Sequence, residues 1–516
     1  MKRFLYFFVI IATCSLFSCG DMIDIYPVEN NTADNFYSSE YEIQQAVVGI
    51  YAYLGGNGGN DYPTDMYWQT SESRSDNLYY ATLANAQRDQ VDMRNFQVTD
   101  VTSLNRDIYA RLYQIVNAAN TLLEKAPKEY TRFHAEARFL RALAYFDLVR
   151  AYGEQPVLDH VVSSEEAKGM QRQSIEDVYK QIIADLEFAG DNLDPFYYGD
   201  EAGRVGAVAA KCLMGEVYVT MAGYPLKDPT GYTKAENTLA GIMDDVKVRF
   251  ANNFGDIFDV NQENTWDIFS VQFASGNQKL GSSLPRYITF GSASTSPFPE
   301  WVYTGYNQLG QDFRVDDRLV NAMKADGDKR FDVTVMDGFW TTIAHGATPE
   351  EDPVNWDARR VVKKFLPQDP ITHTPTDNTN NTIKSANDFP INFPILRPAD
   401  AYLLYAEALI NNGKTGEAEK WINAIRKRAG LPILSNPSIN DIMDERRREF
   451  LGEGKRFFDL VRMGEDTFLA TLKEFSDHYN HVTLMGASEP SKKDMLLPIP
   501  LTVMNIHTSW DNNPGY

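Results

Sequence analysis

The pattern of apolar positions along the chain predicts a mainly helical protein. The clearest segment is Thr131–Tyr152, where apolar residues recur at helical spacing on two roughly opposite stripes. A helix that is apolar on two sides packs between neighbours, so we expect this segment inside a layered stack of helices. The same criterion predicts further helices near residues 40–54, 104–126, 171–190, 204–222 and 233–249.

A second helical block, residues 398–464, predicts a helix, a turn at 412–416, another helix and a stop at Gly430. Helix–turn–helix units of this size are typical of tetratricopeptide (TPR) repeats, although the signature of that repeat is absent. Residues 251–396 between the blocks are rich in turn-forming residues and poor in periodicity. We therefore predict a scaffold of TPR-like helix pairs and an irregular, loop-rich subdomain laid on it.

The N-terminus has the pattern of an export signal. Lys2 and Arg3 precede an apolar run over residues 4–13, and a small residue, Ser18, comes directly before Cys19. This pattern resembles a lipobox, so we predict that residues 1–18 are a removed signal peptide and that Cys19 carries the lipid. An ordinary cleaved signal with an incidental cysteine is the alternative. The polar residues 19–39 are expected to form a tether.

Charge and cysteine content narrow the function classes. The net charge of −22 argues against nucleic-acid binding, which needs a basic surface. Of the three cysteines, Cys14 lies in the predicted signal, Cys19 at the lipid position and Cys212 alone, so no disulfide is expected within the chain. Cys212 falls in an apolar helical pattern and is expected to be a small buried residue.

The most highly charged stretch, DERRREFLGEGKRFFDLVRMG, covers residues 444–464. It is not a phosphate-binding loop, because Arg456 stands where that motif needs Ser or Thr and the first glycine of the motif is missing. The charges fall at i,i+3 and i,i+4 spacings, which predicts ion pairs along a helix and a buried charge network. Gly452 and Gly454 are expected to bend or interrupt that helix.

Signatures of catalysis are missing. The chain has neither a Gly-x-Ser-x-Gly nor a His-Glu-x-x-His motif. His478, His481 and Asp477 could ligate a metal, but three residues at a loop-like site are weak evidence. Exposed polar residues near a helix end explain them better, and we predict no metal site. A glycosidase with paired carboxylates stays open, because some pair among 71 acidic residues always looks suitable. We predict no cofactor and leave open whether a structural calcium ion is bound.

Aromatic residues, 12% of the chain, carry a more informative signal. Several lie in polar, turn-rich segments such as MYWQTSESRSDNLYY and PEWVYTGYN. A flat ring that packs against the C–H face of a sugar, with polar groups at its rim, is the usual chemistry of carbohydrate binding. Although most large rings in a protein are packed inside, we expect at least one pair here to form an accessible platform.

Several strings resemble the SusD/RagB family of outer-membrane nutrient-binding lipoproteins. They are EARFLRALAYFDLVRAYGEQPVL, PILRPADAYLLYAEALINNG, ERRREFLGEGKRFFDLVRMG and LLPIPLTVMNIHTSWDNNPGY, spread from residue 136 to residue 516. The resemblance implies one domain over residues 40–516. In it, the scaffold covers 40–250 and 397–464, the irregular subdomain of about 251–396 carries the ligand surface, and a strap over 465–516 closes the fold.

The resemblance also implies a function. Such a protein sits on the cell exterior, anchored in the outer membrane by its lipid, captures a glycan or oligosaccharide, and delivers it to a SusC-like TonB-dependent porin without catalysis. Asp21 and Asp24 form a sparse acidic export signal, so an inward-facing lipoprotein also stays open. Location and chemistry give these candidate ligand-binding residues: Trp68, Arg74, Asp76, Asn77, Tyr79, Trp266, Trp301 and Tyr303.

Two other hypotheses remain at this point. One is a lipid-anchored glycoside hydrolase, which would release products from a polysaccharide. The other is a TPR-like adaptor, which would bind peptides or protein partners and ignore glycans.

Overall fold

A computed structural model describes residues 36–55, 61–80, 88–276, 278–288, 313–340, 356–366, 368–369, 374–375 and 387–516. Helices make up most of this part of the chain, as predicted. The helices are α2 Glu40–Gly55, α3 Arg88–Arg94, α4 Ser103–Lys125, α5 Thr131–Tyr152, α6 Ser164–Gly169, α7 Ile175–Asn192, α8 Ala207–Ala222, α9 Gly231–Ala240, α10 Met243–Val248, α11 Pro285–Ile288, α12 Asp317–Ala325, α13 Phe331–Thr334, α14 Pro398–Asn411, α15 Thr415–Ala429, α16 Ile439–Glu449, α17 Arg456–Met463, α18 Glu465–Tyr479, α19 His481–Met485 and α20 Leu501–Met504.

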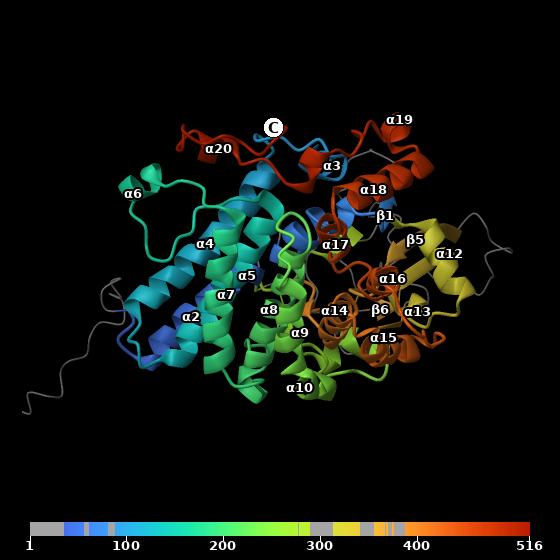
Figure 1. Cartoon of the computed structure of the whole chain (residues 1–516), viewed down its shortest axis with the longest axis horizontal. Coiled ribbons are helices and arrows are strands. Elements are labelled where there is room, and N and C mark those ends of the chain that lie inside the picture. Colours follow the sequence, from blue (N-terminus) through green and yellow to red (C-terminus); the bar gives the residue numbers. More distant parts are fainter. Residues whose placement is uncertain are drawn as a thin grey trace, which may run out of the picture.

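The long helices pack side by side as a continuous stack (Figure 1). Helix α4 packs on α5, α5 on α7, α7 on α8, α8 on α9, and α9 on α14, which in turn packs on α15. Helix α5 is buried on almost every side because α4 and α7 cover its two apolar stripes. The expected layered arrangement of helix pairs is confirmed.

Most predicted helix boundaries agree with the structure to within a few residues. At α7, the Ser174 Oγ accepts a hydrogen bond from the Asp177 N–H at 3.2 Å, which caps the N-terminus of the helix. Helix α15 stops at Gly430, which adopts the left-handed conformation at φ +78°. The single helix predicted over residues 233–249 is wrong, because α9 ends before Gly241, a poor helix former, and α10 begins at Met243.

Short antiparallel strand pairs complete the described part of the chain. Strand β1 (Leu78–Tyr80) pairs with β3 (Phe313–Val315), and β2 (Phe269–Val271) pairs with β8 (Phe393–Leu396). Strand β4 (Val335–Trp340) pairs with β5 (Trp356–Val362). Two-residue strands, β6 (Gln368–Asp369) and β7 (Thr374–Pro375), form the last pair.

The C-terminal segment runs along one edge of the molecule, where α18, α19 and α20 lie above the helical stack in Figure 1. Its backbone is fastened to the ends of α4 and α5. The Leu497 N–H donates to the Ala151 carbonyl at 2.7 Å, and the Asn105 Nδ2 donates to the Pro498 carbonyl at 2.9 Å. The buried Cys212 lies in α8, as expected, and burial raises the pKa of its thiol well above the usual value.

The Gly-Glu-Gly-Lys run forms a tight turn between α16 and α17. The Glu72 carboxylate accepts the backbone N–H groups of Gly452 and Gly454, each at 2.8 Å. Gly454 has φ +70°, and an added Cβ would lie 2.3 Å from the Tyr67 carbonyl oxygen. The run is therefore an anchor for the buried segment that precedes β1, and only glycine fits its close backbone approach.

The predicted buried charge network is confirmed, but its partners differ from the prediction. Glu449 of α16 lies 2.9 Å from Arg397, 3.0 Å from Arg330 and 2.5 Å from Arg428. Glu453 pairs with Arg397 at 2.7 Å. These partners come from distant segments and not from i,i+3 or i,i+4 neighbours, because α16 is surrounded by other elements. Burial opposes ionisation of Glu449, yet the three guanidiniums hold its pKa well below the usual range.

We predict that Gly454→Ala lowers the free energy of unfolding by about 2 kcal/mol or more, because the residue needs a positive φ and has no room for a Cβ. Gly416→Ala is the matched control. Its Cβ meets open space in α15, and the change should stay below about 1 kcal/mol. Urea unfolding followed by circular dichroism measures both, and equal stability of the two variants would contradict the anchor.

Candidate functional site

Four of the predicted ligand residues lie inside the protein. Trp68 is 1% exposed and packs edge-on against Phe313, with 5.7 Å between ring centroids. The expectation of an accessible ring at Trp68 is therefore wrong. Its sequence neighbours are polar, but the segment is covered on all sides, so local polarity misled the prediction.

Arg74, Asp76 and Asn77 are also buried, and each contacts α16 or α17. The Arg74 guanidinium lies 4.3 Å from the centre of the Phe457 ring. Asp76 accepts hydrogen bonds from Arg456 at 2.7 and 3.0 Å, and Asn77 accepts one from the Arg447 Nε at 3.0 Å. Their expected role at a ligand surface is thus replaced by a structural one: they hold the start of β1 in place.

Tyr79 is half-buried and reaches the surface. Strand alternation places Leu78 and Tyr80 in the core and turns Tyr79 outward, opposite Arg314 of β3. Tyr79 lines a hollow of about 410 Å³ together with Arg314, Asp317, Ala358, Arg359 and Arg360. Strand β5 lies beside β3 and contributes the last three of these residues.

An aromatic pair supports the hollow. The Tyr79 ring stacks on Tyr479 of α18, with centroids 3.9 Å apart and planes within 9°. The Tyr479 hydroxyl donates to the buried Asp316 carboxylate at 2.8 Å and accepts the Asp317 N–H at 2.9 Å. Burial, and then the Asp316 carboxylate, raise the pKa of Tyr479 far above the usual value, so this hydroxyl stays a donor. The ring of Tyr79 is therefore held in one orientation.

Charges at the rim are also fixed in place. Arg360 donates to Asp317 at 2.9 Å and to Asp337 at 2.8 Å, and the Tyr79 hydroxyl donates to Asp317 at 3.2 Å. The charged residues that line the hollow are three arginines and one aspartate, in a chain whose net charge is −22. The arrangement offers an aromatic ring, several N–H donors and one carboxylate acceptor.

The remaining predicted residues lie elsewhere. Trp266 is half-buried, donates from its Nε1 to Gln262 at 2.8 Å, and lines a different and much smaller depression with Glu263. Burial raises the pKa of Glu263 to about 7. Trp301, Tyr303 and the lipid-attachment residue Cys19 lie outside the described residues.

Neither a metal cluster nor a membrane-spanning helix is found in the described ranges. Within them, no group of three His, Cys, Asp or Glu side chains is placed to hold a metal ion. His481 is buried and stacks on Tyr80 at 4.9 Å, and burial lowers its pKa to about 4. No helix in these ranges has the length and apolarity that crossing a bilayer requires.

Sequence reasoning missed the other residues of the hollow and the ring beneath it: Arg314, Asp317, Arg359, Arg360 and Tyr479. These residues join Tyr79 through the pairing of β1 with β3 and through α18, and each is more than 200 positions from Tyr79 along the chain. Strands of three residues are too short to show an alternating pattern.

Comparison with known proteins gives two family matches and several close folds. A model described as the SusD family matches residues 254–516, and a model described as starch-binding and associating with the outer membrane matches residues 24–219. A solved SusD homologue from Bacteroides thetaiotaomicron superposes with a TM-score of 0.79 at 21% identity, over 94% of this chain and 98% of the homologue.

Curated relatives agree over nearly the whole length. A SusD-like protein of Bacteroides ovatus is 26% identical over 482 residues, covering 88% of this chain and 81% of the relative. The starch-binding protein SusD of Bacteroides thetaiotaomicron is 24% identical, covering 97% of this chain and 96% of the relative. Because the first family model alone spans more than half of the sequence, this chain belongs to the SusD family.

Proposed function

We propose that this protein binds a glycan or oligosaccharide non-catalytically at the surface of the outer membrane and delivers it to a SusC-like TonB-dependent porin. The observation that carries the proposal is the hollow in which Tyr79, stacked on Tyr479, meets three arginines and Asp317. The family matches, one of them described as starch-binding and associating with the outer membrane, support it.

The chemistry of the hollow suits a sugar. A tyrosine ring offers a flat apolar surface to the C–H face of a pyranose, and its hydroxyl remains a polar contact at the edge. The guanidinium groups of Arg314, Arg359 and Arg360 present planar sets of N–H donors to hydroxyl or carboxylate oxygens. Because Tyr79 and Arg360 are already held by protein contacts, binding costs little ordering of side chains.

Binding without cleavage is favoured over glycoside hydrolysis. Hydrolysis of this kind uses two carboxyl groups on either side of the scissile bond. Among the described residues that line the hollow, Asp317 is the one that carries a carboxylate, and Arg360 and Tyr79 already donate to it. This arrangement lacks the second group of a catalytic pair.

The proposal also includes a lipid anchor for the protein and the transfer of the glycan to the porin. A lipid on Cys19 would hold the protein at the outer membrane, with residues 19–39 as the tether, facing the exterior. The acyl chain places the protein next to membrane-embedded partners, and a captured glycan then has only a short distance to travel. A peptide-binding adaptor would instead need an unpaired strand edge or an apolar groove for a peptide.

We expect Tyr79→Ala to weaken glycan binding about tenfold, because it removes the ring that packs against the sugar. Tyr41→Ala is the matched control, since Tyr41 is 69% exposed on α2 and does not line the hollow. Affinity electrophoresis of both variants in gels that contain starch, laminarin or polygalacturonate measures the change. Equal retardation of the two variants would show that the hollow is not the glycan site.

Arginine at three of the four charged positions predicts tighter binding of acidic than of neutral glycans at low ionic strength. Retention on polygalacturonate should fall as NaCl rises from about 0.05 M to about 0.5 M, whereas retention on a neutral glucan should change little. Arg359→Gln should reduce the acidic retention selectively. Release of soluble products from any of these polysaccharides would favour the hydrolase instead.

A further inference from the structure

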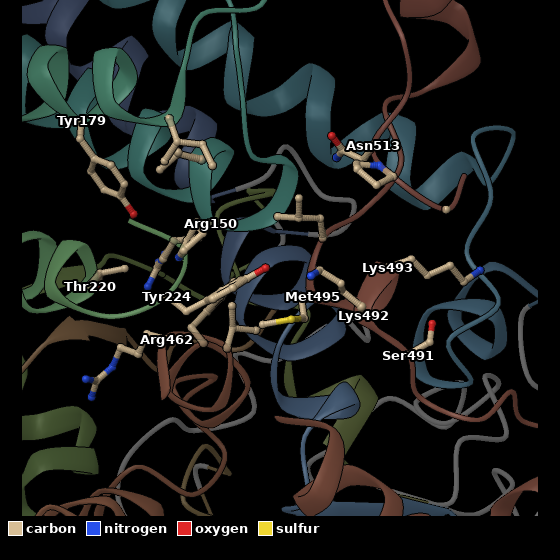
Figure 2. A pocket seen from close by; sticks show the side chains of 18 residues that line it. Arg150, Tyr179, Thr220, Tyr224, Arg462, Ser491, Lys492, Lys493, Met495 and Asn513 are labelled. Atoms are coloured by element: carbon tan, nitrogen blue, oxygen red, sulfur yellow. The ribbon is translucent and has the colours of Figure 1, made fainter. Parts of the chain in front are cut away.

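A second cavity is separate from the Tyr79 hollow. It measures about 590 Å³ and lies between α5, α7, the loop after α8, α17 and the C-terminal segment (Figure 2). Most of its wall is apolar, with side chains that include Val149, Ile175, Phe458, Val461, Met495 and Leu496. It shares no lining residue with the hollow, so it is a second site with its own chemistry.

Among the described residues that line this cavity, the charged ones all have the same sign: Arg150, Arg462, Lys492 and Lys493. Both arginines form ion pairs that neutralise their charge: Arg150 pairs with Asp147 and Glu216, and Arg462 pairs with Glu407 and Asp459.

Lys492 is different from the two arginines. Its side chain is 63% exposed at the edge of the cavity, and its ion pair with Glu465, at 2.7 Å, is of the solvent-exposed kind that contributes little. In Figure 2 its amino group points toward Tyr224 at the centre of the view. The mouth of the cavity therefore carries a cation that an anionic group can approach.

The inner end of the cavity holds polar groups without partners. Tyr179 of α7 is 3% exposed, no hydrogen bond of its hydroxyl is found in the described part of the chain, and Figure 2 shows this hydroxyl directed toward the middle of the cavity. The Nε of Arg150 is likewise buried without a hydrogen-bond partner. A tyrosine hydroxyl that lines the cavity without a hydrogen bond to the protein can donate to an oxygen atom of a bound ligand.

We infer that this cavity binds one amphipathic anion, a long-chain carboxylate that carries a second oxygen near the far end of its chain. The carboxylate meets Lys492 at the mouth, the chain lies along the apolar wall, and the second oxygen accepts from Tyr179. At roughly 30 Å³ for each non-hydrogen atom, the volume a water molecule takes in the liquid, the cavity holds about twenty such atoms.

The test uses isothermal titration of the mature chain with dodecanoate, 12-hydroxydodecanoate and dodecyltrimethylammonium, each below its micelle concentration. Dodecanoate should bind saturably at one site and at least tenfold tighter than the cation of equal chain length. The terminal hydroxyl should tighten binding further, and Tyr179→Phe should remove that gain. Equal binding of the anion and the cation, or no saturable binding of dodecanoate, would overturn the inference.

Two variants locate the site. Val461→Trp fills the cavity and should abolish binding, whereas Val248→Trp, at a position 75% exposed on α10, should leave it unchanged. Lys492→Met alters an exposed side chain, so it should leave the fold intact and weaken dodecanoate about tenfold without affecting the cation. Dodecanoate binding that is insensitive to both Val461→Trp and Lys492→Met would refute the assignment. Glycan retention should be the same in all these variants, because the proposed glycan site lies elsewhere.

Discussion

Two buried aspartates, Asp76 and Asp316, hold the surface hollow in place. Arg456 donates to Asp76 at 2.7 Å, and Arg447 lies 3.2 Å from Asp76 and 3.0 Å from Asp316. Asp76 precedes β1 and Asp316 follows β3, so two arginines of α16 and α17 fasten both strands to the helical stack. Burial alone would raise the pKa of Asp76, yet the two guanidiniums hold it well below its usual range. Breaking a buried ion pair by removing one partner typically costs about 3–5 kcal/mol.

This constraint extends from the core to the surface through a short chain of contacts. Asp316 fixes the Tyr479 hydroxyl, Tyr479 stacks under Tyr79, and Tyr79 lines the hollow opposite Arg314. The charged motif of residues 444–464 therefore has a structural role. Glu449 pairs with Arg397 before α14 and with Arg428 on α15, and Arg447 and Arg456 pair with Asp76 before β1. The glycines of the motif let the segment before β1 approach closely. These contacts hold the hollow in one arrangement before a ligand binds, so binding costs little ordering of side chains.

Helices could be predicted from the sequence far better than the site. Thr131–Tyr152 and the pair at Pro398–Asn411 and Thr415–Ala429 show periodicity long enough to fix their type and nearly their ends. The charge network was also foreseeable, because so many charges beside apolar residues need buried partners. Trp68 was misplaced since a polar neighbourhood along the chain says nothing about what covers a segment in space. The arginine rim depends on a pairing of residues 78–80 with 313–315, and no local pattern encodes such a long-range contact.

The proposed function requires that a glycan binds against Tyr79 and is released chemically unchanged. The most direct measurement is a crystal structure of the protein with the oligosaccharide that it retains most strongly. We predict a sugar ring packed on Tyr79, oxygens within hydrogen-bond distance of Arg360, and every glycosidic bond intact. An oligosaccharide on another face of the molecule, or a cleaved one in the hollow, would contradict the account.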